Sequence, residues 1–238
     1  MLLQRLQRRL AIRVIRGYRT TSAEAACVVS GSIPWELLAE ARASMYQRRI
    51  ALRQQGITPT PSAVKAERHQ SRQLAIEKWK GRLANPRAGH RAVGAIQPIL
   101  EDWLDRRHGR LTFRLVQVLT GYGCFGEYLH EKARREPTTE CHYCDADRDT
   151  AQHTLEVCPA WAGQRRVLVD KIGIDLFLPV VVKAMTGNRE MWRIMVSFCE
   201  VVISQKEAAE REREDDPSSA PVRRRRRGAR RRAFARFP

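Results

Sequence analysis

The chain is poor in aromatic residues and has no long apolar run. Aromatic residues make up 7% of its 238 residues and hydrophobic residues 43%, so we expect a core built mainly from aliphatic side chains. No apolar stretch approaches the roughly 20 residues that a membrane span needs. Arginine interrupts every apolar segment near the N-terminus, which excludes a secretory signal. The Arg-rich, acid-poor start MLLQRLQRRLAIRVIRGYR leaves a mitochondrial presequence open.

Acidic residues are also scarce. Asp and Glu number 26 against 44 Lys and Arg, which gives a formal charge of +18. The last 17 residues, from Val222, contain nine arginines and no acid. A field of this sign attracts polyanions, with nucleic acid as the first candidate and an anionic membrane as the second. We predict RNA or DNA as the partner, and no membrane.

Six cysteines are too few, in a chain of this length without a secretory signal, to predict a disulfide framework. Three of them fall within 18 residues, in ECHYCDADRDTAQHTLEVCPAW. The spacing is Cys141-x2-Cys144-x8-His153-x4-Cys158. Three thiolates and one imidazole match the tetrahedral Cys3His site that zinc favours. We predict one structural Zn²⁺, because four protein ligands leave no position for a catalytic water.

Local signals support this site. Thr150 or Asp149 is placed to cap a short helix that presents His153, and Pro159 to end it. His142 is a weaker ligand candidate beside Cys141 and is expected to face solvent. Ordinary reduced cysteines remain the alternative. A metalloenzyme is disfavoured, because the closed ligand set has no activated nucleophile or carboxylate pair near it.

The periodicity elsewhere predicts a mainly α fold: small helical bundles, a zinc-knuckle insertion and a disordered Arg-rich tail. A capping box at Thr21 and Glu24 predicts the start of a second helix, and Gly31 its end. The run 111–119 suits strand or helix, and we expect helix. The glycines 121, 123 and 126 predict a turn, not a nucleotide loop. We expect the apolar faces of 2–15 and 192–203 to be core.

Four segments are predicted along the chain. They are a helical segment at 1–56, a charged helical connector at 57–110, a helical region at 111–213 that contains the knuckle at 141–158, and a disordered basic tail at 214–238.

Several separated motifs resemble one known family. The stretch GCFGEYLHEKARREPTTECHYCDADRDTAQHTLEVCPAW is similar to the C-terminal CCHC zinc-knuckle region of reverse transcriptases from insect non-LTR (LINE-type) retrotransposons. RRLAIRVIRGYRTTSAEAACVVSGSIPWELLAEARA resembles the thumb-like segment after the polymerase palm, and WLDRRHGRLTFRLVQVLTG the connector before the knuckle. The resemblance implies that Cys141, Cys144, His153 and Cys158 are knuckle ligands. Asp145 and Ala146 replace the glycine common in other knuckles.

The polymerase site of that family is not in the chain. Such a site needs an aromatic-x-Asp-Asp turn between strands, whereas Asp215-Asp216 lies in EREDDPSS and is typical of a charged helix end. The resemblance therefore implies a C-terminal fragment that grips template or target, is inactive alone, and has the rest of the reverse transcriptase, the palm, as a partner.

Nucleic-acid contacts are predicted around the knuckle and in the tail. Tyr143 is the candidate for base stacking, with packing against Trp161 as the alternative. The candidate phosphate contacts are Arg134, Arg135, Arg165, Arg166, Arg223, Arg224, Arg225, Arg226 and Arg227. The arginine run is also typical of a nuclear import signal, so we expect nuclear localisation.

A standalone host protein is the other interpretation: a zinc-stabilised helical module that binds another protein. The genomic frame upstream of Met1 separates the two, because only a fragmented retroelement would carry an in-frame aromatic-x-Asp-Asp motif there.

Overall fold

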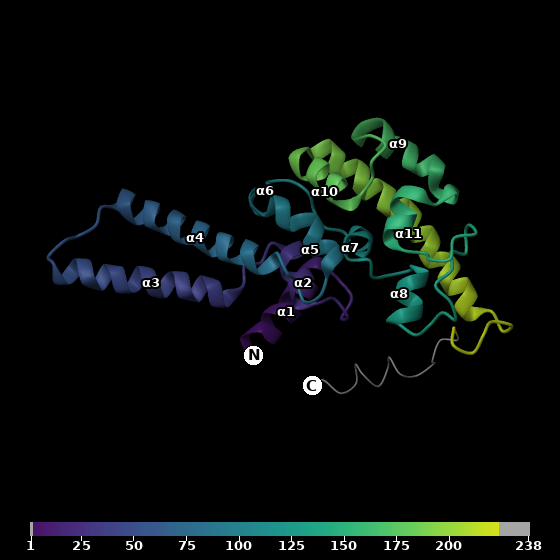
Figure 1. Cartoon of the computed structure of the whole chain (residues 1–238), viewed down its shortest axis with the longest axis horizontal. Helices are drawn as coiled ribbons and strands as arrows, with labels where there is room; N and C mark the ends of the chain where they lie inside the picture. The colour runs from purple at the N-terminus through teal and green to yellow at the C-terminus, as the bar shows by residue number, and fades with distance from the viewer. Residues whose placement is uncertain (1, 224–238) are drawn as a thin grey trace.

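The computed structural model describes residues 2–223, and these contain helices but no strand (Figure 1). The predicted mainly α fold is confirmed. The α-helices are α1 (Leu2–Ile15), α2 (Ala23–Ser30), α3 (Trp35–Gln54), α4 (Pro61–Leu83), α5 (His90–Ile96), α6 (Leu100–Asp105), α7 (Phe113–Thr120), α8 (Gly126–Glu131), α9 (Ala162–Ile172), α10 (Leu178–Gly187) and α11 (Arg189–Asp215). Short turns η1 (Gln97–Ile99), η2 (His153–Val157) and η3 (Pro159–Trp161) lie between them.

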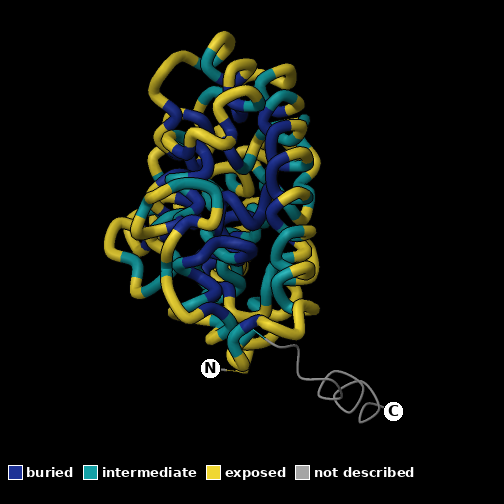
Figure 2. The backbone as a smooth tube through the Cα atoms, turned by 90° about the vertical axis from the view of Figure 1, so that its right-hand side faces the viewer, coloured by how far each residue is buried: buried dark blue, intermediate teal, exposed yellow. Residues whose placement is uncertain are grey.

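Two long helices project from the rest of the molecule. α3 and α4 run side by side as a hairpin at one end, and α11, with α8 and α9 beside it, lies at the other (Figure 1). Between them α2 packs on α1 and α5, and α10 packs on α5 and α11. The buried backbone segments gather inside this packed part (Figure 2). The predicted knuckle segment therefore sits far from the hairpin tip.

The long final helix supplies much of the core. Its buried residues recur every three or four positions, as the helical period requires for one face: Trp192, Met195, Phe198, Cys199, Val202, Ile203 and Lys206. This confirms the apolar face predicted at 192–203. Burial of such a stripe stabilises the fold by about 25 cal/mol for each Å² of apolar surface that it removes from water. Lys206 is the one charged residue of this buried stripe, and its side chain is paired with Asp149.

The first helix buries only part of the apolar face predicted at 2–15. Its exposed apolar residues are Leu2, Leu3, Leu6, Leu10 and Val14. The buried residues are Gln7, Ala11 and Ile15. Gln7 donates to the carbonyl of Ile33 at 2.8 Å and accepts from the amide of Trp35 at 3.0 Å. The expectation that the leucine face is core was wrong, because this glutamine satisfies the start of α3 and draws its own face inward.

The capping box predicted at Thr21 and Glu24 was also wrong. Ser22 is the N-cap of α2, and its hydroxyl accepts from the amide of Ala25 at 3.1 Å. The Glu24 carboxylate instead accepts from the amide of Ala88 at 2.9 Å, in the loop after α4. Gly31 ends α2 with φ 68°, as predicted.

The ambiguous run at 111–119 is helical, as expected. Thr112 caps α7 by accepting from the amide of Leu115 at 3.2 Å, and Gly121 ends it in the left-handed region with φ 74°. α11 continues two residues beyond the predicted Arg213, to Asp215. Within residues 2–223 no helix combines the length and apolarity that a bilayer span requires. The division into four segments stays a prediction.

Candidate metal centre

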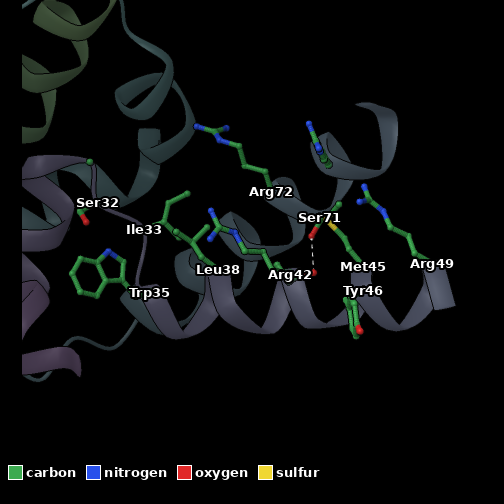
Figure 3. A pocket seen from close by; sticks show the side chains of 13 residues that line it. Ser32, Ile33, Trp35, Leu38, Arg42, Met45, Tyr46, Arg49, Ser71 and Arg72 are labelled. Carbon is green, nitrogen blue, oxygen red and sulfur yellow. Dashed lines mark hydrogen bonds between the residues drawn. The ribbon is translucent and has the colours of Figure 1, made fainter. Parts of the chain in front are cut away.

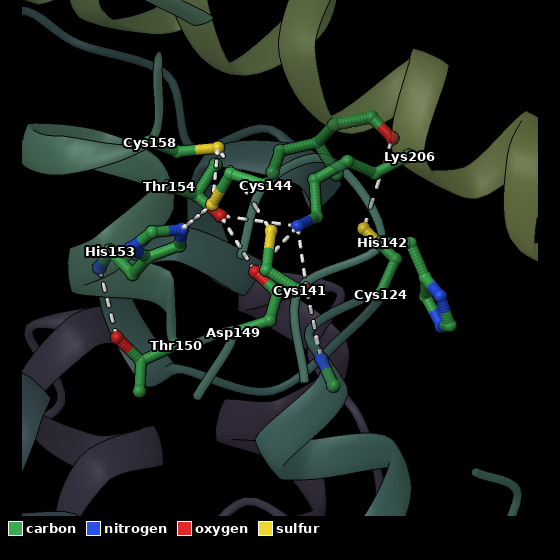
Figure 4. A network of polar contacts seen from close by, with 12 residues as sticks. Cys124, Cys141, His142, Cys144, Asp149, Thr150, His153, Thr154, Cys158 and Lys206 are labelled. Atoms are coloured by element: carbon green, nitrogen blue, oxygen red, sulfur yellow. Dashed lines mark hydrogen bonds and ion pairs between the residues drawn. The ribbon is translucent and has the colours of Figure 1, made fainter. Parts of the chain in front are cut away.

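Four side chains of the segment that follows α8 converge on one point. Cys141, Cys144, His153 and Cys158 each offer one ligand atom, and these atoms lie within 4.8 Å of one another (Figure 4). The Cys141 Sγ lies 4.0 Å from that of Cys158, which is 3.9 Å from that of Cys144. The Cys144 Sγ lies 3.3 Å from His153 Nε2. The four predicted ligands are therefore brought together, and His142 is not among them.

The turn that holds the first two cysteines is closed by backbone hydrogen bonds. The Cys141 amide donates to the carbonyl of Ala146 at 2.9 Å, and the Asp149 amide donates to that of Thr139 at 2.7 Å. Gly126 allows α8 to approach, because a Cβ there would lie 2.7 Å from the Thr139 carbonyl oxygen. The turn thus closes with alanine at 146 and needs no glycine there.

A single wide turn brings the other two ligands to the same point. η2 is a π-helical turn, and the Cys158 amide donates to the carbonyl of His153 at 2.8 Å. Thr150, one of the two predicted caps, accepts from the His153 amide at 2.9 Å. In a π turn the donor amide lies five positions after the acceptor carbonyl, with four residues between them. It therefore brings the residue that starts the turn near the residue that follows its end, which suits the His153–Cys158 spacing.

The cluster fits one tetrahedral ion and does not fit a disulfide. Sulfur atoms around zinc, each about 2.3 Å from it, would lie about 3.8 Å apart. A disulfide needs about 2.05 Å, and all six cysteines are free. Burial raises the pKa of the Cys141 thiol to about 12 and also raises that of Cys158. A cation bound here would displace the thiol protons. These four residues can hold one metal ion.

A buried ion pair fastens this centre to α11. Lys206, 1% exposed, donates to both oxygens of Asp149 at 2.7 and 2.8 Å and to the Thr154 hydroxyl at 3.2 Å (Figure 4). Asp149 also accepts from the amide of Gly126 at 3.0 Å. The sequence alone did not reveal this pair. The one available signal was that Lys206 continues the apolar stripe of Cys199 and Val202 at helical spacing.

Two Pol polyproteins are similar to this chain. The chain is 25% identical over 223 residues to the Pol polyprotein of the type-1 retrotransposable element R1 4 of Nasonia vitripennis. It is 27% identical over 179 residues to that of element R1 of Bradysia coprophila. The chain is related to R1 retrotransposon Pol polyproteins. The matches cover 88% and 69% of this chain but 54% and 17% of the relatives, so the chain spans about half the length of the first.

This relationship confirms the resemblance to non-LTR retrotransposons drawn from the sequence motifs. No family model and no solved structure matches the chain.

Two of the arginines flanking the knuckle in this Pol-related chain are bound internally. Arg165 is 8% exposed and donates to the carbonyls of Thr154, Leu155 and Cys158 at 3.3, 2.9 and 2.7 Å. Arg135 forms ion pairs with Glu210, at 3.2 Å, and with Glu214. Burial lowers the pKa of Arg165. These two residues hold the fold together, and neither presents a free guanidinium to a phosphate.

The remaining candidates differ in their surroundings. Arg134 and Arg166 are exposed. The ring of Tyr143 packs against Trp161, with centroids 4.9 Å apart, which is the alternative that the sequence offered. Arg223 donates to Glu136 at 2.7 Å. The other tail candidates, Arg224, Arg225, Arg226 and Arg227, lie outside the described residues.

Glu136 is a second buried acid that the sequence did not reveal. It is 4% exposed and faces Arg223, Arg213 at 3.5 Å and His142 at 3.4 Å. Burial alone would raise its pKa, but hydrogen bonds from His142 and Arg223 outweigh burial and lower it. His142 is exposed, as predicted, and reaches this carboxylate on the outside of the turn.

Proposed function

We propose that the chain is the nucleic-acid-binding C-terminal region of a non-LTR retrotransposon reverse transcriptase, which grips RNA or DNA through a zinc knuckle and a basic surface. One observation carries the proposal: a closed Cys3His cluster lies in a strongly basic chain related to R1 Pol polyproteins. Three sulfurs and one nitrogen in tetrahedral spacing favour zinc over harder cations.

The zinc would be structural. Its four ligands come from the turn at 141–144 and from both ends of the π turn. The metal would supply the folding energy that holds the two turns together. Two neighbouring side chains fix the backbone of the ligands: Thr150 accepts from the His153 amide, and Arg165 donates to the Cys158 carbonyl.

Nucleic acid would be held mainly through phosphates and unstacked bases. Arg134 and Arg166 are exposed on either side of the knuckle in the chain, and the exposed part of Tyr143 is the proposed stacking surface. The arginine run from Arg223 would add non-specific contact. Nuclear localisation, which rests on the same run, stays a prediction.

Polymerase chemistry is not proposed for this chain. Asp215 is the last residue of α11, and Asp216 follows it and accepts from Ser218 at 2.8 Å; both are exposed. This supports a charged helix end in place of a metal-binding polymerase turn. The proposed partner is the remainder of a larger Pol protein, consistent with the 54% of the Nasonia relative that the alignment covers.

The test is binding of a fluorescein-labelled single-stranded RNA, measured by anisotropy at about 50 and 200 mM salt. Affinity should fall steeply between the two salts, and Cys144→Ser should lower it at least tenfold. A folded variant, Arg134→Gln with Arg166→Gln, should lower it several-fold. The matched control is Arg189→Gln with Arg193→Gln, which removes the same charge from an exposed part of α11.

Two outcomes contradict the proposal. One is RNA affinity that does not differ between wild type and Cys144→Ser. The other is an equal loss of RNA affinity in the two double variants. Arg134 and Arg166 would then contribute only to the net charge of the chain and not to a specific binding site.

A further inference from the structure

A hollow of about 760 Å³ lies along the α3–α4 hairpin (Figure 3). The hairpin is at the other end of the molecule from α8 and α11 (Figure 1). Four arginines and two aromatic residues are among the side chains that line the hollow: Trp35, Arg42, Tyr46, Arg49, Arg68 and Arg72. The two helices supply them from facing sides, with Arg42 and Arg49 on α3 and Arg68 and Arg72 on α4.

The arginines of the hollow are poorly neutralised. Within the described residues, no acid pairs with Arg42 or Arg68. Arg49 has an ion pair with Glu67 at 3.7 Å, but its Nε and Nη2 are buried without a hydrogen bond. Arg72 pairs with the exposed Asp105. Residues 41–73 contain seven basic residues and one acid, so an anion would relieve the repulsion among them.

The hollow is also partly apolar, which decides the kind of anion. Leu38 and Met45 are among its lining residues, as is Tyr46, which is 67% exposed. Phosphate alone would need only the arginines. A base needs a flat or apolar surface as well, and an exposed tyrosine ring provides a stacking platform. Arginines that track a backbone beside an aromatic platform are the combination found in single-strand binding sites.

We propose that this hollow is a second single-stranded nucleic-acid site, in which Arg42, Arg49, Arg68 and Arg72 hold phosphates and Tyr46 stacks on a base. The inference rests on the proposed function only in the class of its ligand, since the site shares no residue with the metal centre. The hairpin and the α11 end of the molecule lie apart (Figure 1). Each site can therefore be disabled separately.

The experiment measures anisotropy of a short fluorescein-labelled oligouridylate bound to the full chain. Arg42→Gln with Arg68→Gln should weaken binding about tenfold and reduce the slope of log affinity against log salt by about 1.4, at about 0.7 per phosphate. The control is Arg48→Gln with Arg53→Gln. It removes the same charge from α3, outside the hollow, and should change affinity less than about twofold.

Tyr46 supplies a second readout. Tyr46→Ala should weaken binding at least about fivefold and Tyr46→Phe should not, since the ring alone stacks. Circular dichroism checks that each variant folds, which is expected because these side chains are at least partly exposed.

The outcomes separate the two sites. If the Arg42/Arg68 and Tyr46→Ala variants bind RNA as well as the Arg48/Arg53 control does, the inference is overturned. A protein partner then becomes the better occupant of the hollow. If they lose binding while Cys144→Ser does not, the inference stands and the knuckle proposal fails. Loss with Cys144→Ser alone leaves the knuckle proposal standing and overturns this one.

Discussion

At the scale of single residues, two buried charges link the candidate metal centre to α11, which the cysteine pattern does not reveal. Lys206 and Asp149 are both nearly inaccessible to solvent, and each would be costly to bury alone. Their pairing joins the candidate metal centre to the last long helix, so this centre is part of the packed core.

Removing one partner of this pair should be strongly destabilising. Lys206→Met leaves the Asp149 carboxylate buried without its cation, so we expect a loss of about 3–5 kcal/mol in the free energy of unfolding. Urea unfolding followed by circular dichroism measures it. Lys183→Met, at an exposed position of α10, is the control and should stay within about 0.5 kcal/mol of wild type. Equal midpoints for the two variants would contradict the pairing.

Sequence reasoning reached the ligands but not this pair, for a physical reason. Spacing along the chain constrains residues within a few turns, and all four ligands lie within 18 residues. Asp149 and Lys206 are 57 residues apart, and only tertiary packing brings them together. The same limit explains α1, where a hydrogen bond network at Gln7 decided which face was buried.

At the scale of elements, the π turn η2 and the start of α9 form one unit. Arg165 spans them by donating to the carbonyls of Thr154, Leu155 and Cys158 at the end of η2. Its neighbour Arg166 is exposed. The sequence predicted the same role for both, because adjacent arginines look alike until the helix places them on different faces.

This pair offers a matched comparison. Arg165→Ala should lower the free energy of unfolding by about 1.5–3 kcal/mol, since charged donors to buried carbonyls are lost. Arg166→Ala should change it by less than about 0.5 kcal/mol while lowering RNA affinity. Chemical denaturation and RNA anisotropy on both variants check this. A stability loss of the same size in both would contradict the assignment.

At the scale of the whole molecule, charge and architecture point to the same kind of partner. The chain carries a charge of +18. Within the described residues, Arg42 and Arg68 of the hairpin hollow have no acidic partner, and Arg134 and Arg166 are exposed near the Cys3His cluster. The helical packing places these two regions at different ends (Figure 1). The metal matters most, because the turn at 141–144 and the π turn η2 converge at the four candidate ligands.

The most direct measurement of the candidate metal centre is zinc K-edge X-ray absorption on the full chain after metal loading, together with zinc content per chain. The account predicts one zinc per chain, with three sulfur neighbours at about 2.3 Å and one nitrogen at about 2.0–2.1 Å, and loss of that signal in Cys144→Ser. A chain that takes up no zinc, or a zinc surrounded by oxygen and nitrogen alone, would contradict it.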